Sequence, residues 1–159
     1  PLYSSAASDV YKRQGGDFVY SQEDVAQMKI SLSELIQLDI QGIVFGALHH
    51  DKSVNIALTQ HICEFARGLP VTFHKAIDCC PDILLATAAL KMTDVRSILT
   101  SGGNSTATQG VQMLKQIIEI AGPEIDIISA GKITSHNINV IHKSIGGKYY
   151  HGKLIVGAL

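Results

Sequence analysis

Residues 69–78, LPVTFHKAID, contain a short apolar run that ends abruptly in polar side chains. The run itself, residues 71–73, is followed at once by His74 and Lys75, and then by Asp78. A strand in a parallel sheet is apolar because helices cover both of its faces. Its carboxyl end carries polar groups where a pocket opens. The stretch therefore predicts a buried parallel strand with a functional site at its end. The alternative is a strand that runs into a solvated loop with an ordinary ion pair.

The same pattern repeats along the chain. Further apolar runs predict strands at residues 42–48, 95–100, 125–129 and 148–151. Amphipathic segments between them predict helices at residues 21–39, 53–67, 81–92, 106–121 and 134–145. This alternation indicates an α/β protein with a parallel sheet and right-handed crossovers. Two architectures fit it: an incomplete (β/α)8 barrel, since a whole one has eight strands and typically ~250 residues, and an open doubly wound sheet.

The composition narrows the class of protein. The chain has 159 residues, of which 46% are hydrophobic and 17% charged, with a formal net charge of -1. These values fit a globular domain and exclude a broad electrostatic attraction to nucleic acid or to an anionic membrane. No apolar run approaches the ~20 residues that a membrane-spanning helix needs. Three cysteines are too few for a disulfide framework. We therefore expect a cytoplasmic protein, with the nucleus as a second location in a eukaryote.

Residues 1–14 differ in character from the rest of the chain. They are small and polar at first and show no sustained helical or strand period. Residues 9–14, DVYKRQ, resemble the translation of an adapter used in sequencing libraries. We therefore expect a leader that is foreign to the fold, with the domain occupying residues 15–159. The alternative is a genuine flexible arm.

Polar side chains and glycines follow the predicted strands, and a barrel would bring them to one mouth. The candidates with reactive side chains are Asp17, His74, Lys75, Asp78, Ser101 and His151. His74 would act as a general acid or base, with Asp78 as the carboxylate that orients it. Backbone N–H groups would cradle a phosphate-like anion at Ser101, Gly102, Gly103 and Gly131. Alternatively, the glycines serve tight turns and the polar side chains pair with one another.

The adjacent residues Cys79 and Cys80 are the candidate metal ligands. Thiolates prefer copper(I) and zinc. Adjacent side chains diverge, however, so the alternative is a pair of small apolar residues of the core. His49 and His50 form a second, weaker candidate in the loop after a predicted strand.

Four blocks of the sequence resemble the CutC family, whose members are often named copper homeostasis proteins. They are residues 13–21 (RQGGDFVYS), 42–48 (GIVFGAL), 69–78 (LPVTFHKAID) and 98–103 (ILTSGG). Weaker matches lie at residues 129–133 (SAGKI) and 150–152 (YHG). The resemblance covers most of the chain from residue 15 to residue 153.

The resemblance implies a TIM barrel, of which this chain would form the carboxy-terminal two-thirds, beginning at the end of the third strand. The two cysteines proposed as copper(I) ligands in some members would lie in the part that is missing. Two departures concern the rim. Lys75 stands where the family usually has arginine, which keeps the charge but loses a bidentate fork. Lys132 stands where the family usually has glycine.

Three hypotheses about function remain. The resemblance implies a protein of copper homeostasis that binds copper(I), and it also implies a homodimer or a higher oligomer. The rim residues favour instead an enzyme of unknown reaction with a small anionic, phosphate-like substrate. The third hypothesis is a fragment without a function of its own, because a barrel that lacks strands exposes sheet edges.

Overall fold

The computed structural model describes residues 16–38, 40–153 and 155. Five parallel strands form one sheet in the order β1-β2-β3-β4-β5. Their bounds are β1 Ile43–Phe45, β2 Val71–Phe73, β3 Ser97–Thr100, β4 Asp126–Ser129 and β5 Tyr149–Tyr150. Each strand pairs with the next one in the chain, as in a barrel. The leader expected at residues 1–14 lies outside the described residues.

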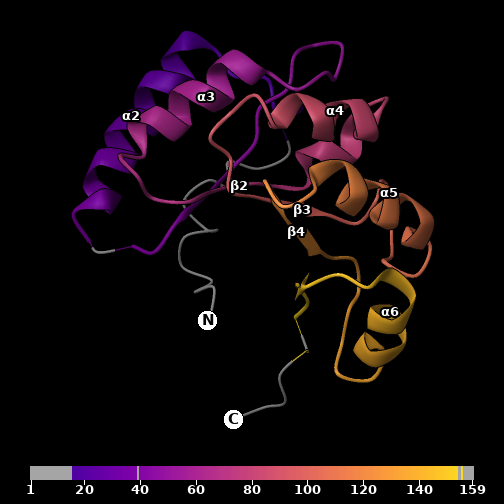
Figure 1. Cartoon of the computed structure of the whole chain (residues 1–159). Helices are drawn as coiled ribbons and strands as arrows, with labels where there is room; N and C mark the ends of the chain where they lie inside the picture. The colour runs from indigo at the N-terminus through magenta and orange to yellow at the C-terminus, as the bar shows by residue number, and fades with distance from the viewer. Residues whose placement is uncertain (1–15, 39, 154, 156–159) are drawn as a thin grey trace.

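Helices join the strands and form an arc along one side of the sheet (Figure 1). They are α2 Gln22–Ile36, α3 Ile56–Phe65, α4 Ile83–Leu90, α5 Val111–Ala121 and α6 Ile138–Ile145, with a short 3-10 helix η1 Lys75–Cys79. The chain is therefore an α/β protein that forms part of a (β/α)8 barrel. This confirms the barrel alternative over the open doubly wound sheet. No helix among the described residues is both long and apolar enough to cross a membrane.

Local capping explains where the helices begin. The Ser21 hydroxyl accepts from the backbone N–H of Asp24 at 3.1 Å, and the Asp24 carboxylate accepts from the N–H of Ser21 at 3.0 Å. This capping box confirms the predicted start of α2. α3, α4 and α6 begin later than predicted, at the caps Asn55, Asp82 and Asn137. The side chains of Asn55 and Asp82 each accept from the N–H three residues on, which fixes the first turn there.

Helix α5 also begins later than predicted, because residues 101–110 form a loop. The N–H of Ala107 donates to the carbonyl of Gly131 at 2.9 Å, which ties this loop to the one after β4. A Cβ atom at Gly110 would lie 2.1 Å from the carbonyl oxygen of Ser101, so only glycine fits this crossing. The loop is thus shaped by contacts with distant residues.

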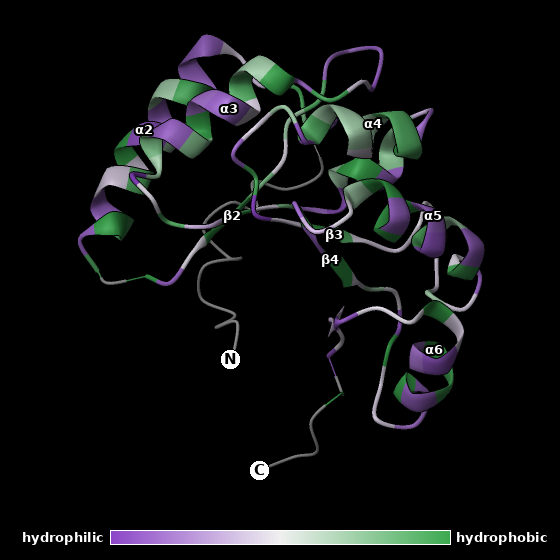
Figure 2. Ribbon diagram, in the orientation of Figure 1, coloured by the Kyte–Doolittle hydropathy of each residue, from purple (hydrophilic) through white to green (hydrophobic). Residues whose placement is uncertain are grey.

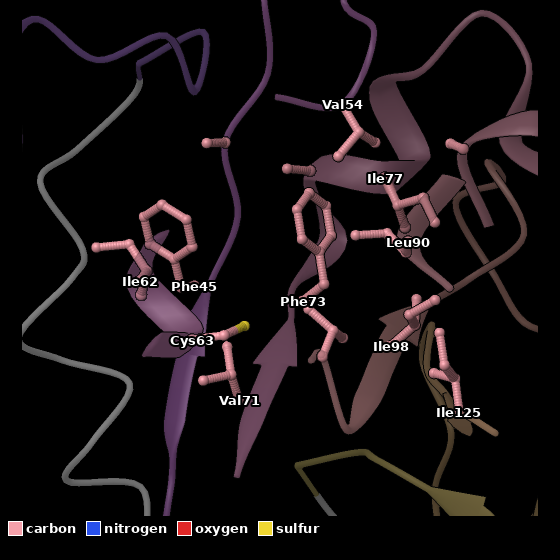
Figure 3. Close-up of a cluster of buried hydrophobic side chains, with 14 of the residues drawn as sticks. Phe45, Val54, Ile62, Cys63, Val71, Phe73, Ile77, Leu90, Ile98 and Ile125 are labelled. Carbon is pink, nitrogen blue, oxygen red and sulfur yellow. The ribbon is translucent and has the colours of Figure 1, made fainter. Parts of the chain in front are cut away.

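The core lies between the sheet and the helices. Phe45, Phe73, Ile98 and Ile127 lie side by side in register across four strands, and each is at most 6% exposed. Figure 3 shows Phe45, Phe73 and Ile98 of this layer in one cluster with Ile62 and Cys63 of α3 and Leu90 of α4. In Figure 2 hydrophilic and hydrophobic residues alternate along α2, α5 and α6, whereas α4 is mostly apolar. Packing against this layer fixes the strand ends on which the rim residues sit.

Candidate functional site at the carboxyl ends of the strands

Asp78 is the centre of the rim between β2 and β3. Its carboxylate accepts from the hydroxyl of Thr100 and from the backbone N–H groups of Ser101, at 3.1 Å, and Gly103, at 2.9 Å. The ammonium of Lys75 lies 2.8 Å from the same carboxylate. The Asp78 side chain is only 11% exposed. Burial alone would raise the pKa of Asp78, but the hydrogen bonds from Lys75, Thr100 and the loop N–H groups outweigh it and lower that pKa.

The sequence predicts that the loop after β3 cradles an external anion through its N–H groups. In the structure the N–H groups of Ser101 and Gly103 donate to Asp78, and that of Gly102 donates to the hydroxyl of Thr100 at 2.9 Å. Gly102 and Gly103 have φ angles of 67° and 70°, a backbone conformation that turns such N–H groups inward. Two of the N–H groups expected to bind an external anion, those of Ser101 and Gly103, therefore bind the protein's own carboxylate.

Lys75 reaches from η1 to the end of β3. Its ammonium donates to the Ser101 hydroxyl as well as to Asp78. The Ser101 hydroxyl lies 2.6 Å from the carbonyl oxygen of Asn104, and the whole residue is buried. The Lys75 side chain remains 47% exposed. Lysine has three N–H donors, so one is left to face solvent or a ligand.

His74 caps η1 rather than pairing with Asp78. Its Nδ1 accepts from the backbone N–H of Ala76 at 3.1 Å. Every hydrogen bond of the Asp78 side chain goes to other partners within the described residues, so the expectation that Asp78 orients the imidazole is wrong. Burial lowers the pKa of His74 to about 4. The imidazole is therefore neutral near pH 7.

The segment before α2 lies against the loop that follows β1. The N–H of Leu48 donates to the carbonyl of Phe18 at 2.8 Å, and the Lys52 ammonium donates to the carbonyl of Asp17 at 3.2 Å. The Phe18 ring lies 5.0 Å from the His74 ring, measured between centroids. The structure thus brings Asp17, which is exposed, to the same sector of the rim as His74.

Gly131 and His151 lie in the next sector, after β4 and β5. Gly131 has a φ angle of 113°, and a Cβ atom there would lie 2.7 Å from the Ala107 nitrogen. The N–H of His151 donates to the carbonyl of Ser129 at 2.9 Å, and its side chain is exposed. No hydrogen bond within the described residues joins either of them to Asp78, although a Cβ atom at Gly131 would also lie 3.0 Å from the Cβ of Ser101. The rim therefore forms one tight cluster around Asp78 and a looser second sector.

Comparison with known proteins gives the family. The chain matches the CutC family over residues 5–156. It belongs to that family. It is 36% identical to the human "Copper homeostasis protein cutC homolog" over 140 residues, which cover 87% of this chain and 50% of the human protein. The mouse protein of the same name is 37% identical over 140 residues, covering 87% of this chain and 51% of its own length. The chain thus spans about half the length of these curated relatives.

Solved structures agree with the fold. The crystal structure of the putative copper homeostasis protein CutC from Streptococcus agalactiae matches with a TM-score of 0.84 and 25% identity, covering 90% of this chain and 70% of that one. N-acetylneuraminate lyase from Proteus mirabilis matches with a TM-score of 0.54 and 12% identity, over 85% of this chain and 52% of that one. The second likeness concerns the fold alone.

The two candidate metal ligands of this CutC chain point apart. Cys79 is exposed, whereas Cys80 is buried, with its Sγ 4.0 Å from the carbonyl oxygen of Ala76. Burial raises the pKa of the Cys80 thiol to about 11, and the nearby Cys79 and Asp78 add to the effect. Within the described part of the chain, no group of three or more His, Cys, Asp or Glu side chains could hold a metal ion. These residues by themselves therefore do not fit a copper centre.

Two surface hollows lie at the amino ends of the strands, at the other end of the sheet from the rim. One, of about 420 Å³, is lined by residues around the start of β2, including Cys63, Pro70 and Arg96. The other, of about 160 Å³, lies around the start of β4, next to Gly122 and Asp126. Neither hollow includes a residue that the sequence predicts for the site.

Sequence reasoning missed two residues of the rim. Thr100 supplies a hydroxyl to Asp78 and also accepts from Gly102. Gly46 lies under the imidazole, because a Cβ atom there would lie 2.5 Å from the His74 Nδ1. A polar residue as the last member of a buried strand was a usable signal for Thr100. Glycine inside the apolar run 42–48 was a usable signal for Gly46, since it marks a close approach of another group.

Proposed function

We propose that the rim at the carboxyl ends of β2 and β3 binds a small anionic ligand, and that Lys75 is the group that receives it. The observation that supports this is the Lys75 side chain: it is 47% exposed, yet its ammonium is fixed by Asp78 and Ser101. A cation held in place loses little rotamer freedom when it binds an anion. The Asp78 side chain is only 11% exposed, so the Lys75 ammonium is the more accessible member of the pair.

This site differs from the phosphate cradle expected from the sequence. Because Asp78 occupies the N–H groups of the loop after β3, the ligand's charge is met by a side chain instead of by the backbone.

The test is a calorimetric titration of the protein with inorganic phosphate at low ionic strength, beside two matched variants. Lys75→Gln keeps an N–H donor for Asp78 but removes the charge, and we expect it to weaken binding roughly tenfold or more. Lys115→Gln removes an exposed charge on α5 and should leave the affinity unchanged. Absence of phosphate binding by the wild-type protein, or equal binding by Lys75→Gln, would overturn the proposal.

A second candidate function is copper homeostasis through copper(I) binding. It is supported by the names of the human and mouse relatives and by one exposed thiol, Cys79. Since Cys80 is turned into the core, Cys79 would need further ligands from another molecule or from the part of the relatives that this chain does not span. The geometry therefore favours the anion site, and copper binding is the weaker proposal.

The copper proposal is tested by competition for copper(I) against a chromophoric chelator under reducing conditions. The copper proposal requires wild-type protein to withdraw copper from the chelator and Cys79→Ser to lose that ability. Cys63→Ser, a change at a buried thiol on α3, serves as the control. No withdrawal of copper by the wild-type chain would count against copper binding by these residues.

A further inference from the structure

The protonation pattern of His74 is set by its place in the backbone turn. Its Nδ1 accepts a hydrogen bond from the N–H of Ala76 at 3.1 Å, so Nδ1 has no proton. A neutral imidazole carries one proton in total, which must then reside on Nε2. The turn thus selects the Nε2–H tautomer before any ligand arrives.

The imidazole is also held in position from two sides. Gly46 lies against its edge, since a Cβ atom there would lie 2.5 Å from Nδ1 and 2.6 Å from Cε1. The Phe18 ring lies at 5.0 Å with its plane tilted by 56°. A donor whose direction is fixed by packing binds an acceptor without a further loss of side-chain entropy.

The Nε2 atom is left available. Within the described residues no hydrogen bond reaches Nε2. The Ser129 hydroxyl is the only side-chain N or O atom there that is both fully buried and without a partner, so Nε2 must be in part accessible. Nε2 is therefore not sealed inside the protein. Because burial lowers the pKa of His74 to about 4, the ring presents Nε2–H as a neutral donor at physiological pH.

We propose that His74 contacts the ligand of the rim as a neutral hydrogen-bond donor through Nε2–H, while the next residue in the chain, Lys75, supplies the ammonium. The ligand would then carry an oxygen acceptor, of carboxylate, carbonyl or phosphoryl type, next to or within its anionic group. This inference rests on the proposed anion site and gives His74 a different role from that of general base. A base would need a free lone pair, and the one on Nδ1 is engaged by Ala76.

The variant His74→Asn separates the ligand contact from the structural role. An asparagine side chain also accepts from the backbone N–H two residues on, so it retains the cap of η1. It has no group that reaches as far as Nε2. His74→Ala loses both the cap and the donor and serves as the reference for a purely structural effect.

Each protein is compared by urea unfolding and by calorimetric titration with inorganic phosphate. We expect His74→Asn to unfold at nearly the wild-type urea concentration and to bind phosphate roughly fivefold to tenfold more weakly, the value of one hydrogen bond. Wild-type affinity in His74→Asn would overturn this inference alone and leave the anion site intact. A wild-type protein that binds no phosphate would overturn the anion site, and this inference with it.

A second measurement observes the wild-type imidazole itself. Nitrogen-15 NMR of histidine-labelled wild-type protein reports the tautomer directly, with the His74 signal assigned by its loss in His74→Asn. We expect a bare Nδ1 and a protonated Nε2 at pH 7, and a shift of the Nε2–H resonance when phosphate is added. The opposite tautomer, or an Nε2–H signal that does not move while phosphate binds, would overturn the inference.

Discussion

At the scale of single residues, Asp78 shows how a site can be organised by an anion that the protein supplies itself. Its carboxylate draws together the end of β3, the glycine turn behind it and the ammonium of Lys75. A buried carboxylate with fewer donors would favour its neutral form. Here the donors lower its pKa instead, so the charge that orders the loop persists at neutral pH.

The two ring nitrogens of His74 have different roles. One ring nitrogen serves the backbone turn, and the other is left for a ligand. The residue is therefore structural and functional at once, and an alanine substitution alone cannot tell the two roles apart. Gly46 supports both, because any larger residue there would displace the ring.

At the scale of elements, the loop after β4 contains a conformational strain that is open to test. Lys132 has a φ angle of 55°, which is unfavourable for any residue with a Cβ atom. Asn137 holds the loop there, since its side chain donates to the carbonyl of Lys132 at 2.9 Å and accepts from the N–H of Thr134 at 2.8 Å. Both bonds use backbone atoms of the loop, so they survive a change of side chain at position 132.

We predict that Lys132→Gly stabilises the protein by about 0.5–1 kcal/mol, because glycine adopts this φ without strain and the gain exceeds its larger unfolded-state entropy. For a chain of this size that corresponds to a rise in Tm of about 1–4 °C. The same substitution at Lys115, inside α5, should instead destabilise by about 1 kcal/mol. Thermal unfolding followed by circular dichroism measures both, and a lower Tm for Lys132→Gly would contradict the strain argument.

The elements themselves were largely predictable, and the reasons are visible in particular residues. Strand ends at Phe73 and Thr100 follow from apolar runs that stop at polar groups, and the start of α2 follows from a local capping box. The start of α5 was not predictable, because the contact between Ala107 and Gly131 joins loops far apart in sequence. Sequence periodicity reports local preferences, and such long-range bonds override them.

The sequence predicted which residues of the site lie near one another, but not which of them are hydrogen bonded. Parallel strands bring their carboxyl ends to one edge, so Asp78 and Ser101 were expected near each other, and they are hydrogen bonded. The hydrogen-bond partners of His74 and Asp78 depend on the turn after β2. This turn is a 3-10 helix, which the periodicity of the sequence did not predict. That turn directs His74 to Ala76 and leaves Asp78 to the next loop.

At the scale of the whole molecule, the described sheet has two edges, at β1 and at β5. The helices cover one side of it (Figure 1), and the polar rim lies at the carboxyl ends of β2 and β3. The rim cluster joins η1 to the end of β3, and β2, which leads into η1, pairs directly with β3 in the sheet. A change of charge in this cluster therefore acts on the central strands and on the cooperative unfolding of the domain.

The dependence of unfolding on pH tests whether a change of charge at the rim alters the stability of the domain. The pKa of His74 is about 4 in the folded protein against 6.5 for an ordinary histidine. Between these values the unfolded chain binds a proton that the folded chain does not, so the free energy of unfolding falls as the pH drops from 6.5 toward 4. The loss is at most about 3 kcal/mol for this shift. Asp78 adds a separate loss at lower pH, as the pH falls from 3.8 through its lowered pKa.

We therefore predict that urea unfolding of the wild-type protein shows decreasing stability from pH 6.5 to pH 4.5, and that His74→Asn removes most of that slope. Asparagine keeps the cap of η1 but has no proton to gain, so its variant should be nearly as stable at the lower pH as at the higher. His61→Asn, at an exposed position on α3, is the matched control and should retain the wild-type slope. If His74→Asn kept the full slope, the buried neutral imidazole would not be its source, and the acid sensitivity would have to arise elsewhere in the fold.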